Sequence, residues 1–270
     1  MSDSQEKLPP LIILCGGQGT RLRNVTELLP KPMVQIGSQP IVWHIMKTYA
    51  AFGVKRFILC LGYKREAFIE YFLNYHAIAT DITIKLGRKQ NITYHGSNGE
   101  EDWEVTLADT GDSAMTGCRV FRASRYLKDR DENFFLTYGD AVANVDISGL
   151  YQSHLENKKL MTVTAVHPAG RFGEMTFSNG IVSGFHEKPQ TGDGFINGGY
   201  MVVKRDFISS YLEDDNGLTL EDAPMRSAVR DGEMAAFEHD GFWQCMDTSR
   251  EFNMLNEMWL SGNAPWTKNW

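Results

Sequence analysis

The sequence predicts an α/β protein built on a doubly wound, mostly parallel sheet. Three observations support this prediction. Short apolar runs rich in branched side chains end at glycine, segments with apolar residues four positions apart lie between them, and the two kinds of segment alternate through the first half of the chain. Continuous apolar runs are typical of strands buried on both faces of a parallel sheet. Their alternation with helices indicates βαβ units, which place helices on both faces of such a sheet.

The elements of the first half are assigned in chain order. The apolar run over 11–15 (LIILC) stops at a pair of glycines, which predicts a strand that ends there. Over 41–52, apolar residues recur at four-residue spacing, which predicts an amphipathic helix that stops at Gly53. The same criteria predict strands over 54–61 and 133–138, and helices over 65–75 and 146–157.

The second half of the chain has a different pattern. Strand candidates follow one another closely and are separated by Gly, Pro and Asn turns, which predicts an antiparallel portion inserted in or appended to the sheet. These candidates cover 161–167, 174–177, 181–187 and 195–203. Two further helices are expected over 220–231 and 248–260. Because no linker, internal repeat or low-complexity tract interrupts the chain, we expect a single domain over 1–270.

Composition and charge argue against several classes of protein. The chain has 270 residues, of which 27 are basic and 34 acidic, and its net charge of −7 disfavours nucleic acid and anionic membrane as partners. No apolar run approaches the roughly 18 residues of a membrane span, and the polar start lacks the pattern of a secretory signal. The four cysteines form no C-x-x-C pair, which fits a reducing, cytoplasmic compartment. Neither an H-E-x-x-H nor a G-x-S-x-G motif occurs, so metalloprotease and serine hydrolase chemistry are not indicated.

A glycine-rich segment follows the first predicted strand. Its start, 16–19 (GGQG), leaves backbone amides free to surround an anion, because glycine has no side chain and accepts positive φ. Arg21 comes two residues later, and its guanidinium suits a phosphate group. The segment matches neither a P-loop nor a dinucleotide-binding fingerprint. It is therefore either a phosphate-binding loop of another kind or an ordinary turn after a strand.

A lysine bracketed by prolines lies further along the chain. In Pro30-Lys31-Pro32 the two prolines restrict the backbone on either side and hold Lys31 in an extended setting. By itself this pattern is either a positioned cation or a surface lysine between helix breakers. The combination of G-G-x-G-T-R-L with P-K-P is far more specific, and it resembles the signature of the sugar-1-phosphate nucleotidyltransferases.

The resemblance extends along the whole chain, and it is to the glucose-1-phosphate cytidylyltransferase subfamily in particular. The segments that carry it are 40–49 (PIVWHIMKTY), 60–64 (CLGYK), 137–140 (TYGD), 170–173 (GRFG), 187–189 (EKP), 196–200 (INGGY), 241–248 (GFWQCMDT) and 264–266 (APW). It implies a Rossmann-like nucleotidyltransferase fold, with a nucleotide-binding half over about 10–145 and a sugar-binding half with the C-terminal helices over about 146–270. It also implies a homo-oligomer.

The resemblance further implies a reaction in which an oxygen of a sugar 1-phosphate attacks the α-phosphorus of CTP, without a covalent enzyme intermediate. Such chemistry depends on positioning and charge neutralisation more than on a nucleophilic side chain. The residues implied for catalysis are Arg21, Lys31, Asp140 and Asp247, with both aspartates as ligands of Mg²⁺. Those implied for the nucleotide are Leu14, Gly16, Gly17, Gly19, Thr20, Arg21, Lys31, Ser113, Thr116 and Arg119. Those implied for the sugar phosphate are Tyr138, Glu187, Lys188 and Asn197.

Several interpretations remain open. Without the resemblance, Asp140 is also compatible with an ordinary loop aspartate and Asp247 with an ordinary helix N-cap. The chain departs from the subfamily pattern at Cys118 and Ala141, which replace glycines, and at Cys245, which replaces a proline. It also departs over 220–224 (LEDAP), where the subfamily tends to have Trp-Glu and then Pro. Because pocket contacts set substrate choice, a transferase of the same mechanism for another sugar 1-phosphate or another nucleoside triphosphate is the nearest alternative. A non-catalytic subunit that binds nucleotide sugar is a more remote one.

Overall fold

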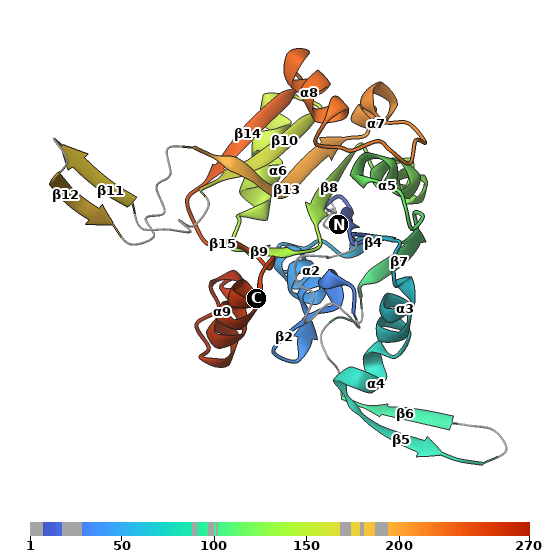
Figure 1. Cartoon of the computed structure of the whole chain (residues 1–270). Helices are drawn as coiled ribbons and strands as arrows, with labels where there is room; N and C mark the ends of the chain where they lie inside the picture. The colour runs from blue at the N-terminus through green and yellow to red at the C-terminus, as the bar shows by residue number, and fades with distance from the viewer. Residues whose placement is uncertain are drawn as a thin grey trace, which may run out of the picture.

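The structure is a computed structural model that describes residues 8–17, 29–87, 91–96, 100, 102–167, 174–178, 181–186 and 194–270. At its centre is a seven-stranded sheet in the order β14-β10-β13-β8-β1-β4-β7 (Figure 1). Its strands are β1 (Leu11–Leu14), β4 (Arg56–Leu61), β7 (Glu104–Asp109), β8 (Asn133–Tyr138), β10 (Met161–Val166), β13 (Ile196–Lys204) and β14 (Met234–His239). β1 runs parallel to both β4 and β8, β4 to β7, and β10 to β14, whereas β13 is antiparallel to β8 and β10. The predicted doubly wound, mostly parallel sheet is confirmed.

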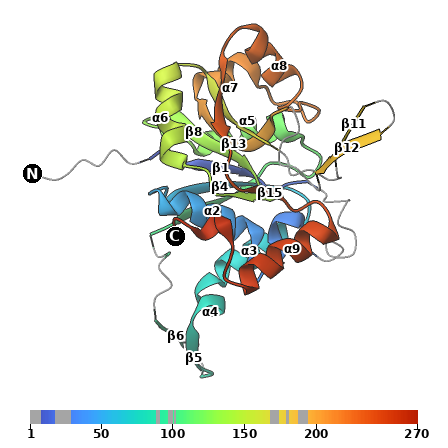
Figure 2. The same ribbon diagram turned by 90° about the vertical axis from the view of Figure 1, so that its left-hand side faces the viewer.

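The central strands are buried on both faces, as their apolar runs predict. In β1, Leu11 and Ile13 belong to one core cluster, and Ile12 and Leu14 to the other, because side chains alternate between the faces of a strand. The helices that contribute to the first cluster are α2 (Ile41–Ala51), α3 (Arg65–Leu73), α6 (Ile147–Asn157) and α9 (Ser249–Leu260). Those of the second cluster are α5 (Thr116–Ala123), α7 (Asp206–Tyr211) and α8 (Ala223–Arg230). Figure 2 shows α2 and α9 on one side of the sheet and α7 and α8 on the other.

Smaller elements lie outside the central sheet. Two antiparallel ribbons, β5 (Asp81–Lys85) with β6 (Asn91–His95) and β11 (Glu174–Ser178) with β12 (Ile181–His186), extend away from the body of the molecule (Figure 1). Two shorter pairs are β2 (Gln35–Ile36) with β3 (Gln39–Pro40) and β9 (Ala141–Ala143) with β15 (Trp243–Cys245). The remaining elements are η2 (Lys31–Met33), α4 (Tyr75–Ala79), η3 (Ser124–Tyr126) and η4 (Pro265–Thr267). In the part of the chain that the structure describes, no helix combines the length and the apolar character needed to cross a membrane.

Most predicted elements agree with the structure to within one or two residues. Gly53 follows α2 with a φ of +103°, which explains why it ends that helix. The antiparallel portion divides, because β10 and β13 join the central sheet whereas β11 and β12 form a ribbon of their own. The sequence does not predict β7 and β14. These are the two edge strands of the sheet, and their partly exposed positions interrupt the apolar pattern.

Candidate active site

The carboxyl ends of β1 and β8 mark the point where the sheet changes direction. From β1 the chain proceeds through β4 to β7 on one side, and then returns to β8 on the other side of β1. In open α/β sheets, ligands bind outside the carboxyl ends of the strands at such a switch point. The backbone N–H of Gly139 donates to the carbonyl oxygen of Leu14 at 3.0 Å. The segment after β1, which contains Gly16, and the segment after β8, which contains Asp140, are therefore adjacent.

Lys31 reaches this point through the close packing of Pro32. Pro30 is extended, but Lys31 is the first residue of the helical turn η2 and Pro32 is the second. The extended setting expected for Lys31 is therefore wrong, because the N–H of Met33 donates to the carbonyl oxygen of Pro30 at 2.8 Å and closes a turn around it. A Cβ placed on Gly139 would lie 2.9 Å from Cγ of Pro32, so the glycine permits this approach. Lys31 is only 9% exposed. The bracketing prolines thus hold the lysine against the end of β8, where Asp140 lies.

Asp247 reaches the same point from the opposite end of the chain. β15 pairs with β9 in antiparallel register, with Cys245 opposite Ala141. The backbone N–H of Met246 then donates to the carbonyl oxygen of Asp140 at 2.8 Å. Strand pairing therefore brings Asp247 beside Asp140, although the two are far apart in the sequence.

The N-cap of α9 is Thr248 and not Asp247. Thr248 Oγ1 accepts a hydrogen bond from the N–H of Glu251 at 3.3 Å, and the Glu251 carboxylate accepts from the N–H of Thr248 at 2.8 Å. The same carboxylate accepts from the backbone N–H of Asp247 at 2.7 Å. The Asp247 side chain takes no part in this capping box, so the interpretation of Asp247 as an ordinary helix cap is wrong.

Lys31, Asp140 and Asp247 form one charged cluster. Lys31 Nζ lies 2.8 Å from Asp140 Oδ2 and also donates to Asp247 Oδ1. Burial lowers the pKa of Lys31, but the two carboxylates outweigh it and raise the pKa above its ordinary value. The lysine is therefore charged at neutral pH. The Asp140 and Asp247 side chains are 36% and 23% exposed, so a ligand can approach both carboxylates.

Two adjacent carboxylates at this edge of the sheet fit the ligands that Mg²⁺ prefers. Mg²⁺ takes oxygen ligands and is commonly held by one or two carboxylates together with substrate phosphate oxygens and water. Asp140 and Asp247 are the residues that would hold it. Elsewhere among the described residues, no group of three or more His, Cys, Asp or Glu side chains forms a metal site. The residues thus fit a cation shared with a substrate rather than one enclosed by protein.

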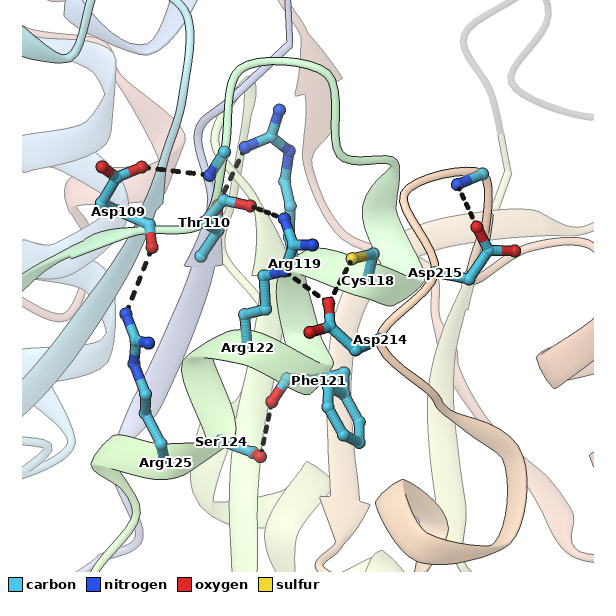
Figure 3. Close-up of polar contacts among 12 residues, drawn as sticks. Asp109, Thr110, Cys118, Arg119, Phe121, Arg122, Ser124, Arg125, Asp214 and Asp215 are labelled. Carbon is cyan, nitrogen blue, oxygen red and sulfur yellow. Dashed lines mark hydrogen bonds and ion pairs between the residues drawn. The ribbon is translucent and has the colours of Figure 1, made fainter.

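Arg119 is buried beside Gly16 and joins three strand ends. Its Nη1 donates to the carbonyl oxygen of Leu61 at 3.0 Å and to Thr110 Oγ1 at 2.9 Å, and Figure 3 shows the contact with Thr110. Its Nη2 donates to the carbonyl oxygens of Gly16 at 3.0 Å and Asp112 at 3.3 Å. These oxygens end or follow β4, β7 and β1. All four acceptors are uncharged, so the guanidinium keeps its positive charge next to the end of β1, where it attracts anions.

Two further arginines, Arg122 of α5 and Arg125 of η3, hold the end of β7 and the segment that follows it (Figure 3). Arg122 Nη1 donates to the carbonyl oxygen of Thr110 at 2.8 Å, and Arg125 Nη2 donates to that of Asp109 at 3.3 Å. Arg122 Nε also pairs with Asp214 Oδ1 at 2.6 Å. Arg122 and Arg125 thus set the backbone path after β7 from the C-terminal part of α5 and from the turn that follows it. This is the start of the segment that contains Ser113, Thr116 and Arg119, which the resemblance assigns to the nucleotide.

Gly16 makes room for the side chain of Arg119. A Cβ built on Gly16 would overlap the guanidinium, and one built on Gly62 would lie 2.6 Å from Nη1. Gly17, by contrast, is exposed and has open space at its Cβ position. The buried arginine therefore requires glycine at position 16, in addition to the anion binding that the sequence predicts there.

The predicted nucleotide residue Thr116 and the predicted sugar residue Tyr138 meet at one carboxylate, Glu221. Thr116 Oγ1 donates to Glu221 Oε2 at 2.6 Å, and the Tyr138 hydroxyl donates to Glu221 Oε1. Thr116 Oγ1 also accepts from the backbone N–H of Leu220 at 2.9 Å. Burial and the Glu221 carboxylate raise the pKa of Tyr138, so its hydroxyl stays protonated at neutral pH.

The structure describes most of the other predicted site residues. Asn197 lies near the start of β13, and its Oδ1 accepts a hydrogen bond from the N–H of Gly199 at 2.8 Å. The Tyr138 ring packs on Gly199. Leu14 ends β1 and is 8% exposed, and Ser113 is exposed in the segment before α5. The predicted residues Gly19, Thr20, Arg21, Glu187 and Lys188 lie outside the described part of the chain. Their roles, and the ligand contacts of the others, stay predictions.

Known proteins resemble this chain in sequence and in fold. A model of the nucleotidyl transferase family matches residues 11–249. The chain belongs to the nucleotidyl transferase family. It is 46% identical to the glucose-1-phosphate cytidylyltransferase of Salmonella typhi, over 96% of this chain and 98% of the relative. It is 39% identical to the probable glucose-1-phosphate cytidylyltransferase of Bacillus subtilis (strain 168), over 94% of this chain and 98% of the relative. The crystal structure of HddC from Yersinia pseudotuberculosis matches with a TM-score of 0.65 and 21% identity, over 93% of this chain and 100% of that chain, which supports the fold alone.

In this nucleotidyltransferase, the site residues that the sequence does not predict act through other residues. Thr110, Gly62 and Glu221 belong to no catalytic motif, yet each contacts or accommodates a predicted site residue. Gly62 lies in 60–64 (CLGYK), one of the segments that carry the resemblance, and directly after a parallel strand, at the same edge of the sheet as Gly16. Glu221 lies in 220–224, where the subfamily tends to have Trp-Glu and then Pro. That likeness does not reveal its two partners, which become neighbours only when the chain folds.

Proposed function

We propose that this nucleotidyltransferase transfers the cytidylyl group of CTP to glucose 1-phosphate, which yields CDP-glucose and pyrophosphate. The observation that carries the proposal is the contact of Lys31 with both Asp140 and Asp247 at the carboxyl ends of β1 and β8. A buried cation with two carboxylates at the switch point suits a ligand that has several phosphates. The choice of CTP and glucose 1-phosphate is supported by the relatives in Salmonella typhi and Bacillus subtilis.

In the proposed reaction an oxygen of the sugar phosphate attacks the α-phosphorus of CTP. A bond forms between this oxygen and the α-phosphorus, and the bond from the α-phosphorus to the bridging oxygen breaks, so that pyrophosphate leaves with that oxygen. Lys31 neutralises negative charge at the α-phosphate, and the buried charge of Arg119 attracts the triphosphate. The amides of Gly16 and Gly17, and those of Gly19, Thr20 and Arg21 further along the same segment, surround the phosphates.

Mg²⁺ belongs to this proposal. When bound, it neutralises phosphate charge and orients the triphosphate. Asp140 and Asp247 hold it, and Lys31 keeps the two carboxylates close together by balancing their charges. Removal of divalent cations by a chelator is expected to abolish turnover, and restoration by Mg²⁺ is the measurement that checks the assignment.

The sugar phosphate is proposed to lie beside the end of β8. Tyr138 and Asn197 offer a phenol and an amide for hydroxyl groups of the sugar, and both lie at this edge of the sheet. Glu187 adds an acceptor for hydroxyl groups and Lys188 a cation for the phosphate. A pocket made of such groups selects the sugar by the hydrogen bonds that it offers.

Pyrophosphate release, measured over a matrix of nucleoside triphosphates and sugar 1-phosphates, tests the proposal. We expect the fastest turnover with CTP and glucose 1-phosphate. Strong preference for UTP or dTTP, or for another sugar phosphate, contradicts the substrate assignment. Nucleotide binding without turnover of any pair contradicts the enzymatic role and favours a non-catalytic subunit.

We also propose that the enzyme is a homo-oligomer in which the β5–β6 ribbon contacts a second copy. The register pairs Ile82 with Tyr94 and Ile84 with Ile92, so these four side chains share one face of the ribbon. Their exposed fractions are between 36% and 48%. A two-stranded ribbon that projects from the body with an uncovered apolar face is marginally stable by itself (Figure 1). Exposed apolar surface of this kind marks an interaction site.

The charges at the two ends of β5 are complementary to those of a second copy of the same strand. β5 begins with Asp81 and ends with Lys85, so two β5 strands that approach in antiparallel fashion place unlike charges side by side. Sedimentation velocity of the wild type and of Ile84→Lys tests this, with Val229→Lys, on the exposed side of α8, as the matched control. We expect Ile84→Lys alone to lower the oligomeric mass. A monomeric wild type, or an unchanged mass in Ile84→Lys, contradicts the proposal.

The cysteines support a reducing, cytoplasmic location for the enzyme. Cys15, Cys60, Cys118 and Cys245 are all free thiols. Burial raises the pKa of Cys15 and Cys60, so neither is a reactive nucleophile.

A further inference from the structure

We propose that Glu221 sets the hydrogen-bond polarity of the Thr116 hydroxyl and thereby contributes to the choice of CTP over UTP. Glu221 is a positioning residue in this scheme, because it acts on the nucleotide through Thr116. The inference rests on the proposed function, in which Thr116 contacts the nucleotide. It adds a physical reason for the choice of base, which the cluster of Lys31, Asp140 and Asp247 does not supply.

The carboxylate of Glu221 determines the direction of its hydrogen bonds. A carboxylate accepts hydrogen bonds and cannot donate them. Thr116 therefore gives its single hydroxyl proton to Glu221 Oε2, over 2.6 Å. One lone pair of the same hydroxyl oxygen accepts from the backbone N–H of Leu220 at 2.9 Å. One lone pair is left, so Thr116 can only accept a hydrogen bond from a ligand.

The backbone around Thr116 holds this arrangement in place. The N–H of Met115 donates to the carbonyl oxygen of Asn216 at 2.9 Å, and the N–H of Gly117 donates to that of Leu218 at 2.9 Å. Because Thr116 lies between these two contacts, its backbone is held beside Leu220 and Glu221, and its hydroxyl can turn away only by giving up its hydrogen bonds with both residues. The segment that carries Glu221 is thus fastened to the start of α5 on both sides of Thr116.

The other oxygen of Glu221 links this arrangement to the proposed active site. The Tyr138 hydroxyl donates to Glu221 Oε1. Tyr138 is the last residue of β8, two positions before Asp140. With one donor on each oxygen, the carboxylate has a fixed orientation at the edge of the sheet where the substrates are proposed to bind.

Cytosine and uracil differ in the group that an acceptor would recognise. The 4-amino group of cytosine donates hydrogen bonds, whereas the oxygen at the same position of uracil and thymine accepts them. The remaining lone pair of Thr116 forms a hydrogen bond with the amino group and opposes the oxygen. A hydroxyl that was free to reverse its direction would serve either base.

Values of kcat/KM for CTP and UTP, measured with glucose 1-phosphate, test the inference. Glu221→Gln preserves shape but its amide can donate to Thr116, so the ratio of CTP to UTP should fall by about tenfold. Thr116→Val should lower the ratio similarly, whereas Thr116→Ser retains the hydroxyl and should preserve it. Asp222→Asn is the matched control, because Asp222 is the neighbouring acid and pairs with Arg226 on the surface.

The outcomes separate this inference from a structural role. An unchanged ratio in Glu221→Gln, or an equal loss with both nucleotides, overturns it, since loss of structure lowers both rates together. If circular dichroism shows that Glu221→Gln is unfolded, the pair Thr116→Ser and Thr116→Val decides, and equal ratios in the two overturn it. A wild type that does not use CTP refutes the proposed function itself, whereas a CTP-specific wild type with an unaltered ratio in the variants refutes this inference alone.

Discussion

The guanidinium of Arg119 occupies the space in which a side chain of residue 16 would lie. Arg119 Nη2 donates to the carbonyl oxygen of Gly16 at 3.0 Å, and Nη1 donates to that of Leu61 at 3.0 Å. One buried arginine thereby joins the ends of β1 and β4 and supports the start of the glycine segment. The position of that segment is therefore coupled to α5, the helix that carries Arg119.

Gly16→Ala is expected to destabilise the protein, whereas Gly17→Ala is not. The new methyl group at 16 would overlap the Arg119 guanidinium, and overpacking of this kind costs about 1–3 kcal/mol. At position 17 the added methyl group meets open space, so the free energy of unfolding should stay the same or rise by up to about 1 kcal/mol. Urea unfolding of both variants checks this. Equal stability of the two contradicts the role given to Arg119.

Lys31→Ala should lower kcat by about 100-fold or more, because it removes the cation that faces the α-phosphate. It should also lower the melting temperature, since Asp140 and Asp247 would then repel each other, and Mg²⁺ should restore part of this loss. Thermal unfolding with and without Mg²⁺ measures both effects. The matched control is Lys47→Ala, which removes the partner of the buried Glu100 and should lower stability with no response to Mg²⁺. A Mg²⁺ response of equal size in both variants would count against a metal at the two aspartates.

Cys118→Gly restores the residue typical of the subfamily. It should lower the free energy of unfolding without improving the affinity for CTP. The Cys118 side chain is fully buried, its Sγ lies 3.6 Å from Asp214, and its backbone N–H donates to the carbonyl oxygen of Leu218 at 3.2 Å. The thiol therefore points away from the glycine segment. Glycine within α5 should cost about 1–2 kcal/mol of stability. A severalfold fall in the KM for CTP would show instead that the thiol hinders the base.

His44 is buried as a neutral ring among the C-terminal aromatic residues. Trp266 Nε1 donates to His44 Nδ1 at 3.2 Å, and His44 Nε2 lies 2.9 Å from the carbonyl oxygen of Ile36. Because Nδ1 accepts from the indole, Nε2 carries the proton. Burial lowers the pKa of His44 to about 4, since a second proton on Nδ1 would face the indole N–H.

The stability of the enzyme should therefore fall as the pH drops from about 6.5 towards 4. A histidine of the unfolded chain takes up a proton in this range, whereas folded His44 does not. The free energy of unfolding at pH 5 is therefore roughly 2 kcal/mol lower than at neutral pH. His154, whose pKa burial also lowers to about 4, adds an effect of the same sign. The measurement is the free energy of unfolding in urea between pH 7.5 and 4.5. In His44→Gln the free energy of unfolding should fall less steeply with decreasing pH than in the wild type. The same pH dependence in both proteins would rule out His44 as a cause of the fall.

The sequence by itself was sufficient for the central strands of the first half, and its resemblance to a family indicated the groups expected to react. Strands buried on both faces leave uninterrupted apolar runs, so β1, β4 and β8 were predictable with small errors at their ends. The edge strands β7 and β14 were not predictable, because a strand with one open edge and partly exposed side chains has only a weak apolar pattern in its sequence. Lys31, Asp140 and Asp247 were identified through a resemblance, since no spacing indicates that residues so far apart share a site.

Only the tertiary structure decided which of these groups touch. Ala141 and Cys245, two departures from the subfamily pattern, are opposite each other in the β9–β15 ladder, so they form one cross-strand pair. The meeting of Glu221 with Thr116 and Tyr138 is likewise invisible in the sequence. Motifs and periodicity report the local backbone and the buried face of each element. Contacts between distant side chains depend on strand register and helix packing, which the whole core determines together.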